Sequence, residues 1–288
     1  MNKCKLLGLV TLYYPEIKSA ADNIQQYLVD VDRLIVWDNS PSHLHVQQQL
    51  MAILEEKGEK IIWHTSNINM YIAPAINYAW NYGAKHEYDL LLIMDQDSRW
   101  VNFSRFFKEV ETLYSSHREW IYTPYIVGLD EWKKNSSLQL RRIFINSGTI
   151  VPITILNAID GVDEAFPLDA LDHDTALRCL KRGFKVVSLT SHVMYHTMGH
   201  PKRSGILRIL TPDYPSDRLY SIVRSHIINY RKNHQWMTSY EKKRFFNEFI
   251  FWTFIRIILV EKPKKERFKM YWKGIKEGLN FNINLTKQ

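Results

Sequence analysis

The chain has 288 residues, of which 45% are hydrophobic and 24% are charged, and its formal net charge is +8 at pH 7. This composition is typical of a globular protein with one large domain, or one domain and an appendage. Two cysteines, Cys4 and Cys179, exclude a disulfide framework and form no C-x-x-C pair, so we expect a cytoplasmic location. No apolar run is long enough to span a bilayer.

The first 200 residues alternate strand and helix patterns. The apolar run at 6–12 is short and soon interrupted by polar residues, which favours a first strand over a signal peptide. Further strands are predicted at 33–39, 60–65 and 89–95, and helices near 18–30, at 43–58 with Gly58 as the end, and at 73–85. This order predicts an α/β fold with a mostly parallel central sheet and flanking helices.

Polar residues recur where these strands end, and ligands of parallel sheets gather at the carboxyl ends of the strands. Each of them alone is as typical of a turn or a helix cap. Their recurrence at successive strand ends favours a binding site. The residues are Thr11 and Tyr13, Asp38 and Asn39, Asn67 and Asn69, and Asp95 and Asp97.

Asp95 and Asp97 follow the buried run LLLIM with one residue between them. On an extended segment their side chains point the same way, and the two charges repel unless a cation lies between them. All-oxygen ligands suit Mg²⁺ or Mn²⁺, whose shell substrate phosphates often complete. The alternative is a solvated turn in which Ser98 caps the next helix.

Several motifs together resemble the inverting glycosyltransferases of family 2, which have the GT-A (Rossmann-like) fold. The D-Q-D-S form is similar to that of bacterial rhamnosyltransferases. The chain departs from the family pattern at Asp174, where Glu is usual, and at Ser221 and Ser225, where Tyr and Asn are usual. The motifs are YYP, VWDNS, NINMYIAPAIN, MDQDS, VDEAFPLDALDHDTALRCLKRGFKV (162–186) and RLYSIVRS (218–225).

The resemblance implies a role for individual residues. Asp38 contacts the nucleobase, Asp95 lies near the ribose or the metal, and Asp97 is the direct metal ligand. Asp172 matches the general base, and His196 completes the metal shell or touches a phosphate. The other implied donor contacts are Thr11, Tyr13, Asn67, Asn77, Ser147, Gly148, Arg218 and Arg224.

Simpler interpretations of four of these residues stay open. Asp172 is also a suitable helix cap or first-turn acid. His196 fits a structural role equally well, and Ser147 and Gly148 fit an ordinary turn.

The resemblance implies metal-dependent, inverting transfer of a sugar from a nucleotide-sugar donor. The implied donor is dTDP-L-rhamnose and the acceptor a cell-surface polysaccharide or a polyprenyl-diphosphate-linked oligosaccharide. Another donor, such as UDP-galactofuranose or a UDP-hexose, is the first alternative, and a non-catalytic membrane or nucleic-acid binding module is the second. A nucleotidyltransferase also uses paired acids, but the chain lacks an early glycine-rich phosphate loop.

The C-terminal third differs in charge from the rest of the chain. Residues 201–288 hold 19 Lys or Arg and 7 Asp or Glu, whereas residues 1–200 hold 19 and 23. We therefore expect a catalytic domain at 1–200 and a basic helical region at 201–288. Within this region, residues 245–278 suit a helix pair that lies on the anionic inner face of the cell membrane. We therefore expect a membrane, and not nucleic acid, as the partner of the basic region. A core helix packed on the catalytic domain would show the same periodicity.

Overall fold

The computed structural model describes residues 4–127, 137–196, 202–204, 208–212 and 214–287. The chain divides into two compact units. The sheet unit comprises Met1–Val162 and Arg178–His196, and the helical unit comprises Asp163–Leu177 and Thr197–Gln288. The domain boundary expected at residue 200 lies outside the described residues.

The sheet unit is built around a nine-stranded sheet formed by described residues, in the order β3-β2-β1-β4-β8-β6-β9-β5, with β7 paired to β9. The first four strands in this order are parallel, as the sequence predicts, and the sheet becomes mixed beyond β4. The strands are β1 (Leu6–Leu12), β2 (Arg33–Asp38), β3 (Ile61–Thr65), β4 (Leu90–Asp95), β5 (Arg99–Trp100), β6 (Trp120–Val127), β7 (Leu138–Arg141), β8 (Thr149–Pro152) and β9 (Lys185–Tyr195).

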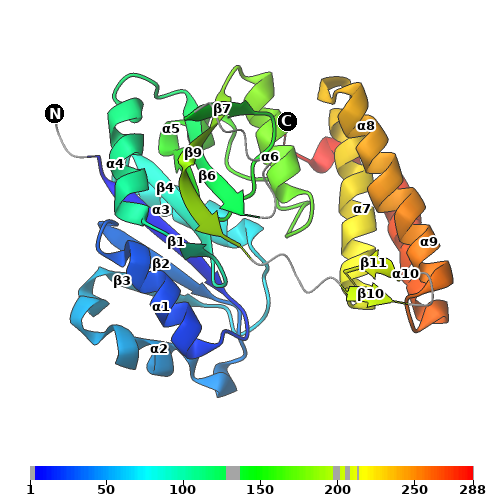
Figure 1. Ribbon diagram of the computed structural model, residues 1–288, viewed down its shortest axis with the longest axis horizontal. Coiled ribbons are helices and arrows are strands. Elements are labelled where there is room, and N and C mark those ends of the chain that lie inside the picture. The colour runs from blue at the N-terminus through cyan, green and yellow to red at the C-terminus, as the bar shows by residue number, and fades with distance from the viewer. Residues whose placement is uncertain (1–3, 128–136, 197–201, 205–207, 213, 288) are drawn as a thin grey trace. The chain divides into compact units, whose positions relative to one another are not determined.

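Helices cover both faces of this sheet (Figure 1). Leu6 and Val10 of β1 belong to a buried cluster shared with α1, α2 and α4, whereas Leu7 lies near Gly83 of α3. Because both faces are covered, β1 and β4 consist almost wholly of buried apolar residues. The helices of this unit are α1 (Ile17–Leu28), α2 (Val46–Leu54), α3 (Ala73–Lys85), α4 (Phe103–Tyr114) and α5 (Ile153–Ala158).

The helix expected at 43–58 is shorter in the structure. A 3₁₀ turn at Ser42–Leu44 ends at His45, whose φ of 48° is left-handed, and α2 begins only at Val46. After Leu54 the chain continues as a second 3₁₀ segment, Glu55–Lys60, so Gly58 does not end an α-helix. A left-handed residue interrupts the α-helical hydrogen-bond pattern, and apolar periodicity does not reveal it.

The helical unit packs around α7, whose buried residues form a cluster with α9 and α10. Gly274 and Gly278 of α10 face α7, and an added Cβ would lie 3.0 Å from the Tyr220 oxygen and 2.9 Å from Ile227 Cβ, respectively. None of the described helices is long and apolar enough to cross a membrane. The elements are α7 (Ser216–Asn233), α8 (Ser239–Phe245), a π-helical turn (Phe246–Phe251), α9 (Trp252–Leu259), α10 (Lys264–Asn280), β10 (Lys202–Ser204) and β11 (Ile209–Thr211).

Helix α6 (Leu171–Lys181) belongs to both units, because its first turns are grouped with the helical unit and Arg178 with the sheet unit. The buried Arg178 guanidinium donates to the Gly161 oxygen at 2.8 Å and also to the Ile159 oxygen. These bonds attach the end of α6 to the loop after α5.

Candidate active site

Three predicted metal ligands meet at the carboxyl end of β4. Asp95, Asp97 and His196 each offer a ligand atom, and these atoms lie within 4.8 Å of one another. The Asp97 side chain is 46% exposed, whereas that of His196 is 13% exposed. Two carboxylates and one imidazole form a group that could hold a divalent cation such as Mn²⁺ or Mg²⁺.

A chain of two buried hydroxyl groups lies behind the three predicted metal ligands. The Asp95 backbone N–H donates to Ser147 Oγ at 3.1 Å, and Ser147 Oγ lies 2.6 Å from Ser98 Oγ. Ser98 Oγ lies 2.8 Å from His196 Nδ1. Both serines are fully buried, so the hydroxyls orient the imidazole from behind the ligand group.

The structure contradicts the alternative in which Ser98 caps the next helix. The N-cap of α4 is Asn102, whose side chain accepts from the Arg105 N–H at 2.9 Å. Ser98 instead faces inward. The sequence analysis missed its contact with His196, because the two residues lie far apart in the chain.

Gln96, the middle residue of D-Q-D, also has a structural task that the sequence analysis did not assign. Its side chain accepts from the Tyr13 N–H at 2.8 Å and donates to the Tyr13 oxygen at 3.1 Å. Its backbone oxygen accepts from Asn23 Nδ2 at 2.9 Å. Gln96 thus fixes the loop after β1, including the exposed Tyr13, to the end of β4.

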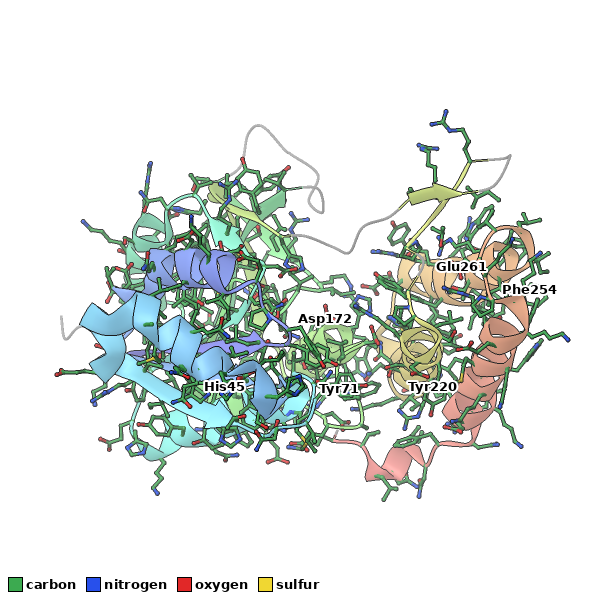
Figure 2. All side chains as sticks on the ribbon, turned by 90° about the horizontal axis from the view of Figure 1, so that it is seen from below. His45, Tyr71, Asp172, Tyr220, Phe254 and Glu261 are labelled. Atoms are coloured by element: carbon green, nitrogen blue, oxygen red, sulfur yellow. The ribbon has the colours of Figure 1, made fainter. Side chains whose placement is uncertain are left out.

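A pocket opens at the carboxyl ends of β2 and β3. It has a volume of about 400 Å³, and its lining includes Asp38, Thr65 and Asn67 as well as Trp63 and His45. Asp38 is 5% exposed, and its Oδ1 accepts from the Ser40 N–H at 2.8 Å. Figure 2 shows His45 at the start of α2. Most of the lining residues are polar, with apolar side chains such as Trp63 and Met51 among them, so the pocket offers a ligand both hydrogen bonds and apolar contact.

The sheet register links this pocket to the metal group. Thr11 of β1 is paired with Asp95 on one side and with Trp37 on the other, and Leu12 is paired with Asp38. The pocket and the acids therefore lie along one edge of the parallel strands. The structure brings Thr11, Tyr13, Asp38, Asn67, Asp95, Asp97, Ser147, Gly148 and His196 to the carboxyl-terminal edge of the sheet or directly behind it.

Asn77 occupies a different position. It lies on α3, is 7% exposed, and both atoms of its amide are bonded to the backbone of Val162, at 2.9 and 3.1 Å. This double contact holds α3 to the start of the 162–186 segment.

Gly148 has a backbone that only glycine adopts without strain. Its φ is 77°, and an added Cβ would lie 2.5 Å from Met194 Sδ. Its N–H donates to the Ile93 oxygen at 2.8 Å, which fixes the neighbouring Ser147 behind Asp95.

The remaining predicted residues belong to the helical unit. Asp172 lies in the first turn of α6, partly exposed, and its Oδ1 accepts from the His173 N–H at 2.9 Å (Figure 2). Arg218 Nε lies 3.8 Å from Asp169 Oδ1, and Arg224 donates to the Ala165 oxygen at 3.4 Å. Both arginines therefore contact the loop that precedes α6.

Asp169 is the most perturbed acid of this loop. Burial raises its pKa to about 6, Arg218 and a hydrogen bond from Ser221 act in the opposite direction, and Asp172 adds to the rise. Its Oδ2 is buried without a hydrogen-bond partner among the described residues. A carboxyl group in this setting binds its proton at a higher pH than an exposed aspartate, and loses it as the pH rises through about 6.

The chain is similar in sequence to a known glycosyltransferase. No family model matches it. It is 25% identical over 248 residues to the dTDP-rhamnosyl transferase RfbF of Shigella flexneri, a match that covers 80% of this chain and 81% of the relative.

Solved structures resemble the chain in fold. A mannosyltransferase of Pyrobaculum calidifontis in complex with GDP-Man and Mn²⁺ aligns with a TM-score of 0.60 at 11% identity, over 97% of this chain and 87% of its own. Residues 1–349 of S. aureus TarS with UDP-GlcNAc align with a TM-score of 0.57 at 13% identity, over 96% and 81%. The chain has the GT-A fold.

A third structure shares only part of its length with this chain. GalNAc-T7 with UDP, GalNAc and Mn²⁺ aligns with a TM-score of 0.57 at 10% identity. The alignment covers 86% of this chain and 55% of GalNAc-T7. The solved structures show the fold, and the sequence similarity to the Shigella transferase agrees with the family 2 resemblance of the motifs and supports glycosyltransferase activity.

Proposed function

We propose that the protein is a metal-dependent, inverting glycosyltransferase that uses a nucleotide-sugar donor. The observation that carries the proposal is the meeting of Asp95, Asp97 and His196 at the sheet edge that also bears the Asp38 pocket. Acids and an imidazole beside a pocket of about 400 Å³ suit a ligand with a diphosphate at one end and a base at the other.

The protein's own residues perform three tasks in this reaction. Asp38 accepts a hydrogen bond from the base of the donor, in a pocket whose wall includes Trp63. Asp95, Asp97 and His196 hold Mn²⁺ or Mg²⁺, which when bound offsets the charge that develops on the departing diphosphate. Ser98 and Ser147 keep the imidazole and the Asp95 backbone in place.

Asp172 is the proposed general base. An inverting transfer needs a carboxylate that takes the proton of the acceptor hydroxyl while that oxygen attacks the anomeric carbon. Asp172 is partly exposed and held in the first turn of α6 by its bond to the His173 N–H. The helix start gives the carboxylate a fixed direction.

For the donor we propose dTDP-L-rhamnose, and for the acceptor a growing surface polysaccharide or a lipid-linked oligosaccharide. The sequence similarity to the Shigella dTDP-rhamnosyl transferase supports this choice. UDP-galactofuranose and UDP-hexoses are the competing donors. The fold alone does not select among donors, because proteins of similar fold are recorded with UDP-GlcNAc and with GDP-Man.

The test combines metal binding with donor turnover. Mn²⁺ affinity is measured by calorimetry, and hydrolysis of a panel of nucleotide sugars is measured with Mn²⁺ present. Asp97→Asn should weaken Mn²⁺ binding at least tenfold and abolish turnover, with an unchanged circular dichroism spectrum. Asp22→Asn, which removes an exposed acid of α1, is the matched control and should change neither.

A second variant separates the general base from the metal site. Asp172→Asn should retain Mn²⁺ and donor affinity while losing transfer to the acceptor. Equal Mn²⁺ affinity in Asp97→Asn and Asp22→Asn contradicts the metal site. The absence of turnover with every nucleotide sugar and acceptor contradicts the enzyme and favours a binding module.

A further inference from the structure

The helical stretch Ser239–Leu259 has two unlike faces. Phe245, Thr253 and Ile257 are buried in the helical unit. The opposite side presents large apolar residues to solvent, with Tyr240 72% and Phe246 62% exposed. The further exposed residues are Phe251, Trp252, Ile258 and Leu259.

The π-helical turn at Phe246–Phe251 keeps these faces apart. The inward-facing positions Phe245, Phe249, Thr253 and Ile257, of which Phe249 is partly buried, are each four residues apart. Three such steps exceed three α-helical turns by about one third of a turn. The wider π turn takes up part of this excess, so one face packs against α7 and α10 over the full length of the stretch.

Cations surround a pocket on the exposed side. The pocket has a volume of about 490 Å³, and its lining includes Lys243, Arg244 and Arg256 together with Tyr240 and Trp252. Glu248 is the acid in this lining, and its Oε2 lies 3.0 Å from Arg244 Nε. The pocket therefore retains an excess of positive charge beside two aromatic rings.

The same surface continues onto α10 and the loop before it. The ring of Trp272, which is 55% exposed, lies 6.4 Å from the ring of Phe254 on α9. Exposed cations follow the apolar residues at the end of α9 and along α10. These are Lys262, Lys264, Lys265, Lys269, Lys273 and Lys276.

We propose that this face docks the helical unit on an anionic lipid bilayer, with the Lys243–Arg244–Arg256 pocket taking a lipid phosphate headgroup. Trp and Tyr prefer the boundary between acyl chains and headgroups, and lysines beside them attract anionic lipid. The face thus has the composition of a helix that lies in the interface.

Charge favours a bilayer over a second copy of the chain. An isologous contact through this face would bring six exposed lysines of each copy toward those of the other. Such like-charge contacts are unfavourable at low ionic strength, whereas an anionic surface neutralises them. The proposal is independent of the transferase reaction, since it concerns binding and not turnover.

The test is flotation of the full-length protein with vesicles of phosphatidylcholine alone or mixed equally with phosphatidylglycerol. The protein should bind the mixed vesicles and bind the neutral ones far more weakly. Lys243→Gln with Arg256→Gln should lower partitioning about fivefold for each cation removed. Trp252→Ser with Leu259→Ser should lower it tenfold or more, because both side chains leave water on docking.

Matched controls come from the sheet unit. Lys85→Gln with Lys108→Gln removes the same charge from exposed positions, and Ile53→Ser with Val101→Ser removes exposed apolar groups. Neither pair should change partitioning, and all variants replace exposed or partly exposed side chains, so thermal unfolding should match the parent. Equal losses in the control pairs, or no binding to mixed vesicles, would overturn the proposal. So would a dimer in sedimentation velocity that Trp252→Ser with Leu259→Ser dissolves.

Discussion

Gly148→Ala tests the packing behind the metal site. A left-handed φ costs a residue with a Cβ about 1–2 kcal/mol. The new methyl group would also lie 2.5 Å from Met194 Sδ, 2.8 Å from Met194 Cε and 3.2 Å from Pro124 Cγ. Met194 is fully buried, so its side chain has little room to move, and overpacking of this kind costs about 1–3 kcal/mol more.

Gly183→Ala is the matched control. Its φ of 82° imposes the same backbone penalty, but none of the described residues has an atom within 4 Å of the added Cβ. Both glycines lie in the sheet unit, so urea unfolding followed by circular dichroism reports the same transition for both variants. Gly148→Ala should be less stable than Gly183→Ala by about 1–3 kcal/mol. Equal unfolding free energies would refute the assigned contact with Met194.

Three other substitutions probe the rest of the structure. Ser98→Ala should cost about 1–3 kcal/mol of unfolding free energy, since buried polar partners lose a bond, and should weaken Mn²⁺ binding about tenfold or more; unchanged calorimetry would contradict the contact with His196. Asp169 has a pKa raised from 3.8 to about 6 in the folded state, so its contribution to stability is full below pH 3.8 and is lost as the pH rises through about 6. Asp169→Asn should therefore stabilise the protein at pH 8, by up to about 3 kcal/mol, and not at pH 3.5. Equal effects at the two pH values would contradict the raised pKa of Asp169. Gly278→Ala should lower the unfolding free energy of the helical unit by about 1–3 kcal/mol, because its Cβ would lie 2.9 Å from Ile227 Cβ, and a neutral result would show that α7 and α10 separate easily.

The sequence predicted the parallel half of the sheet well, because β1 and β4 are apolar runs with few other interpretations. It also predicted that Asp95 and Asp97 would lie together, but for a different reason: β4 ends at Asp95, and Asp97 lies in the turn that follows. The mixed half of the sheet was harder to predict from the sequence. Strands β5 and β7 are short, and their pairing with β9 depends on contacts distant in sequence.

Within the candidate site, sequence patterns identified residue types better than their partners. The position of Ser98 in the sequence is compatible with a helix cap and equally with a contact to His196, so the sequence alone does not distinguish the two roles. Asn77 was expected at the donor, but its amide is bonded to Val162 in the structure. For the C-terminal region, one face of α8–α9 packs in the helical unit and the other is exposed, so lipid contact stays a prediction.

The hydroxyl chain between Asp95 and His196 has a directional property. If Ser98 donates to Nδ1, the neutral imidazole carries its hydrogen on Nε2 and cannot ligate a cation there. If Nδ1–H donates to Ser98, the hydroxyl hydrogen of Ser98 turns toward Ser147 and Nε2 keeps its lone pair. Rotation of the two buried hydroxyls thus exchanges an imidazole whose Nε2 donates a hydrogen bond for one whose Nε2 accepts, while Nδ1, which lies 3.7 Å from Asp97 Oδ1, stays bonded to Ser98.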